Sequence, residues 1–257
     1  MTLADLPPAR TEPDGSAVVR LLSYNIRSMR DDRRALARVI RASAPDVVCV
    51  QEAPRFFRWR KHAAWLARAC GLVYVTGGAT ATGPMILARL RATVLRTEDV
   101  LLPHTPGLHR RGFATAVLRF GASAPLGVLS FHLSLQRDER AAQSGLLLDR
   151  LAALRAAGAV HTVAAGDVNE RPTGGSFRRL AGQAQDAWAA KPWGGEYTST
   201  PDRPHQRIDA VFASDGLDVL GCGVPRGLDG VTDADLRAAT DHLPVLAALR
   251  VPPPPAS

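Results

Sequence analysis

The segment from Val160 to Glu170, a short apolar run that ends in polar residues, constrains the fold of this chain more than any other feature. The run through Val163 and Gly166 leads directly into Asp167-Val168-Asn169. Such a run of β-branched and small apolar residues is typical of a buried strand. Side chains two positions apart in an extended segment point the same way, so Asp167 and Asn169 are expected to meet at one spot. The alternative is an Asx turn after the strand.

Polar side chains also stand at the ends of other apolar runs, far apart in the chain. They are Asn25, Glu52, His132, Asp209, Asp241 and His242. A sheet scaffold builds one active site on its rim by placing carboxylate, amide and imidazole groups at its strand ends. The sequence therefore predicts a single site that is assembled from many segments.

These segments together resemble the endonuclease/exonuclease/phosphatase superfamily, the metal-dependent phosphohydrolases that include deoxyribonuclease I and exonuclease III. The pieces that carry the resemblance occur in the family's order, from about residue 18 to about residue 250. They are Ser23-Tyr24-Asn25-Ile26, Gln51-Glu52, Arg111-Gly112, Ser130-Phe131-His132-Leu133, Gly166-Asp167-Val168-Asn169, Arg207-Ile208-Asp209 and Thr240-Asp241-His242. The resemblance implies an α/β fold, namely a four-layer α/β/β/α sandwich of two packed mixed sheets with outer helices.

The resemblance also implies a metal site. Glu52 is the first expected ligand, with Asn25 beside it and Asp241 reaching the same region. Hard oxygen ligands favour Mg²⁺, and Mn²⁺ is the expected substitute. The simpler alternatives are a surface acid at a strand end for Glu52 and a turn-forming amide for Asn25.

The expected catalytic residues are the remaining acids, amides and imidazoles of the matching pieces. Asp167 is expected to orient or deprotonate the attacking water, and Asn169 to hold the scissile phosphate. His242 is expected to stabilise the phosphate or act in acid–base catalysis, with Asp209 orienting its ring. A turn-capping Asp209 and a core histidine at position 242 are the alternatives.

His132 helps to place the chain within the family that it resembles. Exonuclease III-type abasic-site enzymes commonly carry Asn at the matching position. Deoxyribonuclease-I-like, sphingomyelinase-like and phosphoinositide-phosphatase-like members carry His. A second imidazole on the leaving-group side fits general acid catalysis. Arg111 is expected either to contact phosphate or to hold local structure.

Basic residues follow nearly every one of these pieces, and the formal net charge is +8 with a pI of about 10.4. Arg55, Arg58 and Arg171 are predicted to contact substrate phosphates beyond the scissile one, which would suit a nucleic acid. A solvated surface is the alternative. All but two of the 32 basic residues are arginine, which is also typical of a GC-rich genome.

The sequence is interpreted as a divalent-metal-dependent phosphoester hydrolase, specifically a phosphodiesterase or nuclease. One alternative is an exonuclease-III-like abasic-site DNA repair nuclease, which His132 disfavours. The other is a non-catalytic phosphate-binding scaffold of the same fold, which the intact set of acids and imidazoles disfavours. The sequence leaves open whether the substrate is DNA, RNA, a phosphoinositide or another phosphoester.

A single domain is predicted over residues 17–251, between a disordered segment at 1–16 and a Pro-rich tail at 252–257. With 46% hydrophobic residues, the 257-residue chain can bury a large core. It shows no signal peptide and no apolar run of about 20 residues, so we expect a cytoplasmic monomer with no membrane span. The three cysteines are expected to be free thiols. The predicted longer helices are 31–42, 55–70 and 137–157.

Overall fold

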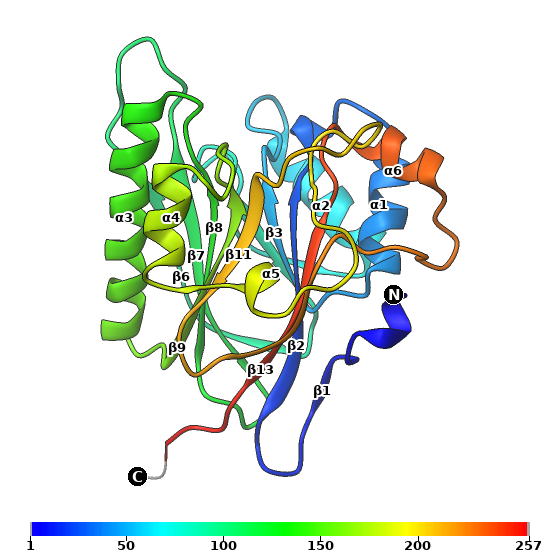
Figure 1. Cartoon of the computed structure of the whole chain (residues 1–257), viewed down its shortest axis with the longest axis vertical. Coiled ribbons are helices and arrows are strands. Elements are labelled where there is room, and N and C mark those ends of the chain that lie inside the picture. Colours follow the sequence, from blue (N-terminus) through cyan, green and yellow to red (C-terminus); the bar gives the residue numbers. More distant parts are fainter. Residues whose placement is uncertain (1, 256–257) are drawn as a thin grey trace.

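Two β-sheets packed face to face, with helices on both outer sides, make up the computed structural model, which describes residues 2–255 (Figure 1). The predicted four-layer α/β/β/α sandwich is confirmed. The prediction for the Pro-rich tail falls partly outside the described residues, because the description ends at 255.

The first sheet has the strand order β12-β13-β2-β3-β5-β4, and β1 pairs with the start of β2 at Ala17 and Val18, before the part of β2 that pairs with β3. Its strands are β1 (Arg10–Thr11), β2 (Ala17–Asn25), β3 (Val47–Gln51), β4 (Val73–Gly77), β5 (Met85–Ala88), β12 (Asp218–Gly223) and β13 (Val245–Val251). The second sheet has the order β10-β11-β9-β8-β7-β6. Its strands are β6 (Ala92–Leu101), β7 (Gly112–Phe120), β8 (Leu126–His132), β9 (His161–Asp167), β10 (Gln185–Asp186) and β11 (Asp209–Ala213).

The helices form the two outer layers. They are α1 (Arg33–Ala42), α2 (Trp59–Cys70), α3 (Arg137–Ala156), α4 (Gly175–Ala181), α5 (Ala187–Ala190) and α6 (Asp233–Ala239), with short 3₁₀ turns η1 (Leu3–Asp5) and η2 (Arg27–Met29). Figure 1 shows α3 and α4 on the outside of the second sheet, and α1, α2 and α6 on the outside of the first. None of the helices in residues 2–255 is long and apolar enough to cross a membrane.

Apolar residues on both faces of the central strands hold the layers together. Leu21 packs in the core between the sheets, whereas its neighbour Leu22 packs under α1 and α2. Phe131 faces α3 and α4 in a third cluster. Because adjacent strand residues point to opposite faces, strands covered on both sides need nearly continuous apolar sequence. The three cysteines are buried free thiols, as expected.

Two predictions about local structure are wrong, and one helix was missed. Residues 2–16 are not disordered, because Leu6 is buried and the guanidinium of Arg20 donates to the carbonyl oxygens of Leu6 and Pro7. The second helix begins at Trp59 rather than at Arg55, since Arg58 has a left-handed backbone with φ of 57°. Helix α6 was not predicted from the sequence. It packs against α1, and Thr232 caps it through a reciprocal bond with Asp235.

Candidate active site

Three predicted site residues lie in one row across the second sheet. In the strand register, His132 of β8 is opposite Asp167 of β9, and Asp167 is opposite Asp209 of β11. The parallel strands β8 and β9 end at the same edge, and the antiparallel β11 begins there. Glycine is required at position 166, because a Cβ atom would collide with the carbonyl oxygen of Phe131. The close approach of β8 and β9 therefore sets His132 beside Asp167.

His242 reaches the same row from the segment before β13. Its Nδ1 lies 2.8 Å from Oδ2 of Asp209, and its Nε2 lies 3.8 Å from Oδ2 of Asp167. Both acids are 1% exposed. The result is a buried carboxylate–imidazole pair next to a second buried carboxylate.

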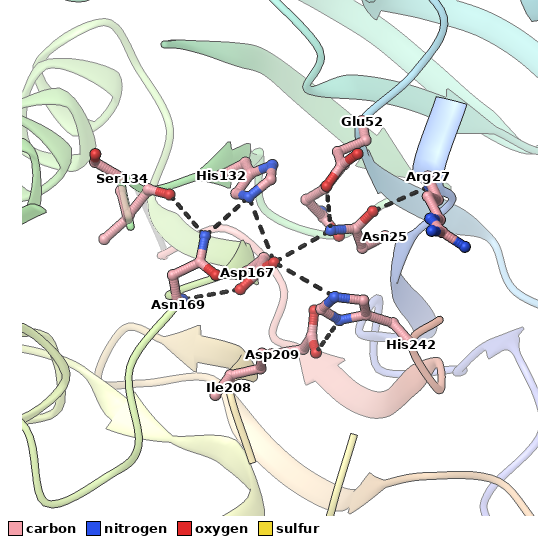
Figure 2. A network of polar contacts seen from close by, with 12 residues as sticks. Asn25, Arg27, Glu52, His132, Ser134, Asp167, Asn169, Ile208, Asp209 and His242 are labelled. Carbon is pink, nitrogen blue, oxygen red and sulfur yellow. Dashed lines mark hydrogen bonds and ion pairs between the residues drawn. The ribbon is translucent and has the colours of Figure 1, made fainter. Parts of the chain in front are cut away.

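Asn25, the last residue of β2, joins the two sheets at this edge. Its Nδ2 donates to Oε1 of Glu52 and to Oδ2 of Asp167, at 3.1 Å in each case. Figure 2 shows Asp167 at the centre of the network, between His132, Asn25, His242 and Asn169. The predicted convergence of strand ends is therefore present in the structure.

A cavity of about 410 Å³ opens above this network. Its lining residues are Ser28, Arg30, Glu52, Arg55, Thr82, His109, Arg111, His132, Leu135, Asp167, Asn169 and His242. The lining combines two acids and one amide with several basic side chains. Such a cavity suits an anionic group that approaches a cation or a protonated imidazole.

Strained backbone is concentrated at the cavity. Ser28, Glu52, Thr82 and Asn169 have φ of 56°, 53°, 58° and 54° respectively, and all four line the cavity. Non-glycine residues rarely adopt this left-handed region. They persist where the surrounding structure fixes them, which is frequent at functional sites.

The structure corrects the expected geometry of Asp167 and Asn169. The strand ends at Asp167, and Asn169 is left-handed rather than extended. Its backbone N donates to Oδ1 of Asp167 at 2.8 Å, which is the Asx turn that was the alternative. The Asx turn therefore forms, and it also keeps Asp167 and Asn169 close together.

Both hydrogens of the Asn169 side-chain amide are used within the protein. Nδ2 lies 2.9 Å from the carbonyl oxygen of Leu133 and 2.9 Å from Nε2 of His132. The amide can donate to a phosphate only if one of these bonds is given up. The present contacts favour a role in orienting His132 over the expected grip on the scissile phosphate.

The surroundings of His132 favour a neutral ring, whereas the predicted general-acid role needs a protonated one. Burial, followed by the charges of Arg111 and His242, holds the pKa of His132 well below its ordinary value. A neutral ring can accept the Asn169 hydrogen bond at Nε2. Because a general acid of this kind must carry the extra proton near neutral pH, the structure does not support that role.

Asp167 and His242 have opposite electrostatic surroundings. Burial, and then the nearby charge of Asp209, raise the pKa of Asp167 to about 7. Burial lowers the pKa of His242, but the charge and hydrogen bond of Asp209 outweigh it and raise the pKa to about 10. A carboxylate that titrates near neutral pH beside a cationic imidazole is an arrangement suited to acid–base chemistry.

Arg111 is a buried cation that faces the acids. Burial lowers its pKa, while the charges of Asp167 and Glu52 oppose the shift. Its Nε is buried without a hydrogen-bond partner among the described residues. An arginine that lines the cavity with an unused donor fits the expected phosphate contact.

Two groups of side chains fit a divalent cation. Glu52 and Asn25 offer only oxygen ligands, as a hard cation requires, and Glu52 lines the cavity. Asp167, Asp209 and His242 form the second group, with one ligand atom of each within 4.8 Å of the others. Nδ1 of His242 is bonded to Asp209, so this group could bind a cation only through Nε2 while that bond is kept. The expected ligands Glu52 and Asn25 stay a prediction.

Several predicted residues lie outside the cavity lining. Asp241 pairs with Arg27, with its Oδ2 3.4 Å from Nε, so its role as a metal ligand stays a prediction. Arg58 stacks on Phe57, and Arg171 is exposed on the loop after β9. Ser28, Thr82 and Leu135 line the cavity but were missed, since no motif marks them.

The two packed sheets, with acids, amides and imidazoles at one edge, define the class of protein as a phosphoesterase fold. The model of the endonuclease/exonuclease/phosphatase family matches residues 22–242. The chain belongs to this family, which is divalent-metal-dependent and whose members are typically phosphoester hydrolases.

Solved structures agree on the fold. An endonuclease/exonuclease/phosphatase from Bacteroides vulgatus has a TM-score of 0.74 at 17% identity, covering 91% of this chain and 99% of its own. The mannosyl-6-phosphatase of Bacteroides thetaiotaomicron has a TM-score of 0.73 at 19% identity, covering 90% and 99%. Truncated TDP2 from Caenorhabditis elegans has a TM-score of 0.70 at 19% identity, covering 90% and 97%. No curated protein sequence matches the chain.

Proposed function

We propose that the protein is a divalent-metal-dependent phosphodiester hydrolase that acts as a nuclease or related phosphodiesterase. The observation that carries the proposal is the position of Asp167. This buried acid contacts Asn25 of the Glu52 group on one side and lies beside the His242–Asp209 pair on the other. An acid with a pKa near neutrality, next to a fixed cation, is what water activation at a phosphate requires.

Most polar residues of the site have a proposed task. Asp167 orients the attacking water and takes its proton. His242, held cationic by Asp209, stabilises negative charge on the phosphate. Asn169 holds His132 in place, and Arg111, which lines the cavity, contacts the phosphate.

Glu52, with Asn25 beside it, would hold the cation, and Mg²⁺ is the ion that this oxygen donor set favours, with Mn²⁺ as the substitute. When bound, the cation would neutralise negative charge on the phosphate.

A substrate panel tests the proposal. It comprises bis-p-nitrophenyl phosphate, p-nitrophenyl phosphate, single-stranded and plasmid DNA, an abasic duplex, RNA, phosphoinositides and sphingomyelin, each with Mg²⁺. Hydrolysis of phosphodiesters in preference to the monoester is expected. The monoester is included because a structural neighbour is a sugar-phosphate phosphatase by name. Faster hydrolysis of the monoester would replace the phosphodiesterase by a phosphatase, and cleavage restricted to the abasic duplex would favour the repair nuclease.

The pH dependence should follow Asp167 and His242. Since Asp167 must be ionised and His242 protonated, kcat/KM is expected to rise as pH increases through about 7 and to fall above about 10. Asp209→Asn removes the charge that raises the pKa of His242, so the alkaline limb should move to lower pH. The measurement is a pH–rate profile on a small diester. An unmoved alkaline limb would show that His242 does not produce it.

The assignment of Glu52 predicts a metal-specific defect. Glu52→Gln keeps an oxygen acceptor for the Asn25 amide but removes the charge. The Mg²⁺ concentration for half-maximal activity is expected to rise by about 10-fold or more. Asp241→Asn is the comparison, because Asp241 pairs with Arg27 outside the cavity lining. If Asp241→Asn shifts the Mg²⁺ requirement and Glu52→Gln does not, the assignment is reversed.

A further inference from the structure

The loop between Glu52 and α2 exposes two adjacent aromatic rings, and Arg55, the residue before them, lines the cavity. Phe56 and Phe57 are each 80% exposed. Burying a phenylalanine side chain contributes about 1.5–3 kcal/mol, so two neighbouring rings left in water are a costly feature for a folded chain. Single exposed apolar residues are ordinary, but an exposed pair that directly follows a residue of the cavity lining indicates a binding surface.

The loop is fixed in a conformation that keeps these rings outside. The backbone N of Ala53 donates to the carbonyl oxygen of Gly83 at 2.9 Å. Nη1 of Arg55 donates to the carbonyl oxygen of Thr82 at 3.3 Å. Phe56 is four residues from Glu52, so the backbone separates them by at most about 14 Å. The two phenylalanines therefore follow directly on the cavity residues Glu52 and Arg55, within reach of a polymeric substrate that extends out of the cavity.

Cations flank the two aromatic rings along this segment. The guanidinium of Arg55 lies 5.6 Å from the ring centre of Phe56, and that of Arg58 lies 5.0 Å from the ring centre of Phe57. Arg60 and Lys61 follow, and no acidic residue occurs between Glu52 and Glu98. The segment thus combines stacking surfaces with uncompensated positive charge.

We propose that the segment 55–61 binds single-stranded nucleic acid, with bases stacked on Phe56 and Phe57 and phosphates in contact with Arg55 and Arg58. The inference rests on the proposed phosphodiesterase function and names its substrate class. Aromatic rings interleaved with basic side chains are how proteins bind single strands without sequence preference. Bases inside a duplex are already stacked on each other, so a duplex cannot use the rings.

A lipid membrane fits these observations less well. Inserting the rings into a bilayer would carry the guanidinium groups of Arg55 and Arg58 toward hydrocarbon, which is costly. A base can stack on one face of a ring while a guanidinium covers the other face, and the guanidinium can then attract a phosphate of the same strand.

The test is the binding of labelled oligonucleotides by fluorescence anisotropy, in EDTA so that no hydrolysis occurs. The ligands are a single strand, an abasic sugar-phosphate strand of the same length, and the matching duplex. The protein is expected to bind the single strand at least about 10-fold more tightly than the abasic strand, because stacking contributes about 1–3 kcal/mol per base. Phe56→Ser/Phe57→Ser should abolish that difference, and Phe56→Trp/Phe57→Trp should keep it.

Two further variants separate stacking from charge. Leu90→Ser changes an apolar residue that is 87% exposed elsewhere and should leave every affinity unchanged. Arg55→Ser/Arg58→Ser should flatten the dependence of binding on salt, whereas the serine variant of the two phenylalanines should not. Circular dichroism spectra confirm that each variant is folded.

Three results would overturn the inference. The first is equal affinity for the normal and abasic strands, and the second is unchanged binding by Phe56→Ser/Phe57→Ser. The third is binding to anionic phospholipid vesicles that is lost in that variant, with no binding of the single strand. Hydrolysis of bis-p-nitrophenyl phosphate by the unaltered protein is measured separately. Hydrolysis without oligonucleotide binding retains the proposed function and rejects the inference. Oligonucleotide binding without hydrolysis rejects the proposed function and leaves the binding surface in place.

Discussion

Replacing Asp167 by Asn is expected to lower kcat for a phosphodiester by about 10²-fold or more. Asparagine has nearly the same shape but cannot take a proton from water. Because burial raises the pKa of Asp167 to about 7, ionising this acid costs folding free energy. In the unaltered protein, stability falls as pH rises from the ordinary aspartate pKa to about 7. The variant does not undergo this loss, because asparagine does not ionise. At pH 8 this gain offsets the loss of one of the two acceptor oxygens that Asn169 and Asn25 use, so the melting temperature of Asp167→Asn should stay close to that of the unaltered protein.

The two readouts together separate catalysis from structure. A melting temperature that falls together with kcat would mean that Asp167 is needed for the fold. A change confined to KM would mean that it binds substrate without acting on the transition state. Asn25→Asp is not a suitable control, because it would set a third carboxylate against Glu52 and Asp167. Asp149→Asn, on α3 and outside the cavity lining, is suitable and should change neither readout.

Replacing His242 by Gln should also lower kcat by about 10²-fold or more. The glutamine amide can donate to Asp209 but cannot carry the positive charge. The charge contributes to stability as well, since the pKa of His242 is raised to about 10 by Asp209. That contribution is fully present below the ordinary histidine pKa and is lost as pH rises through about 10.

His242→Ala is the informative comparison for this prediction. It leaves the buried carboxylate of Asp209 without its partner, which costs about 3–5 kcal/mol. We therefore expect His242→Ala to have a lower melting temperature than His242→Gln, while both lose kcat. Nearly normal kcat in the glutamine variant would exclude a role for the imidazolium in the reaction.

Much of the fold was predictable from the sequence. The apolar runs ending at Asn25, His132 and Asp167 are strands, and the family order of the polar pieces implied the sandwich, which the structure confirms. The start of α2 was not predictable, because the left-handed backbone of Arg58 depends on a loop fixed by Ala53 and Arg55 through tertiary hydrogen bonds. The packing of residues 2–16 depends equally on a distant partner, the side chain of Arg20.

The site was predictable as a set of residue types but not as a network. The family resemblance implied that Asp209 orients His242, and Nδ1 of His242 lies 2.8 Å from Oδ2 of Asp209. The neutral state of His132 could not be predicted, because it results from burial and from cations contributed by other segments. The engagement of the Asn169 amide by Leu133 and His132 likewise depends on a turn that a motif does not specify.

The central claim is tested most directly by hydrolysis of bis-p-nitrophenyl phosphate by the purified protein. The rate is measured with Mg²⁺, after removal of the metal with EDTA, and after Mg²⁺ is restored. We predict turnover with Mg²⁺, loss of turnover in EDTA and recovery on re-addition, with Asp167→Asn at least about 10²-fold slower throughout. Full activity in EDTA, or equal rates for Asp167→Asn and the unaltered protein, would contradict a metal-dependent phosphodiesterase centred on Asp167.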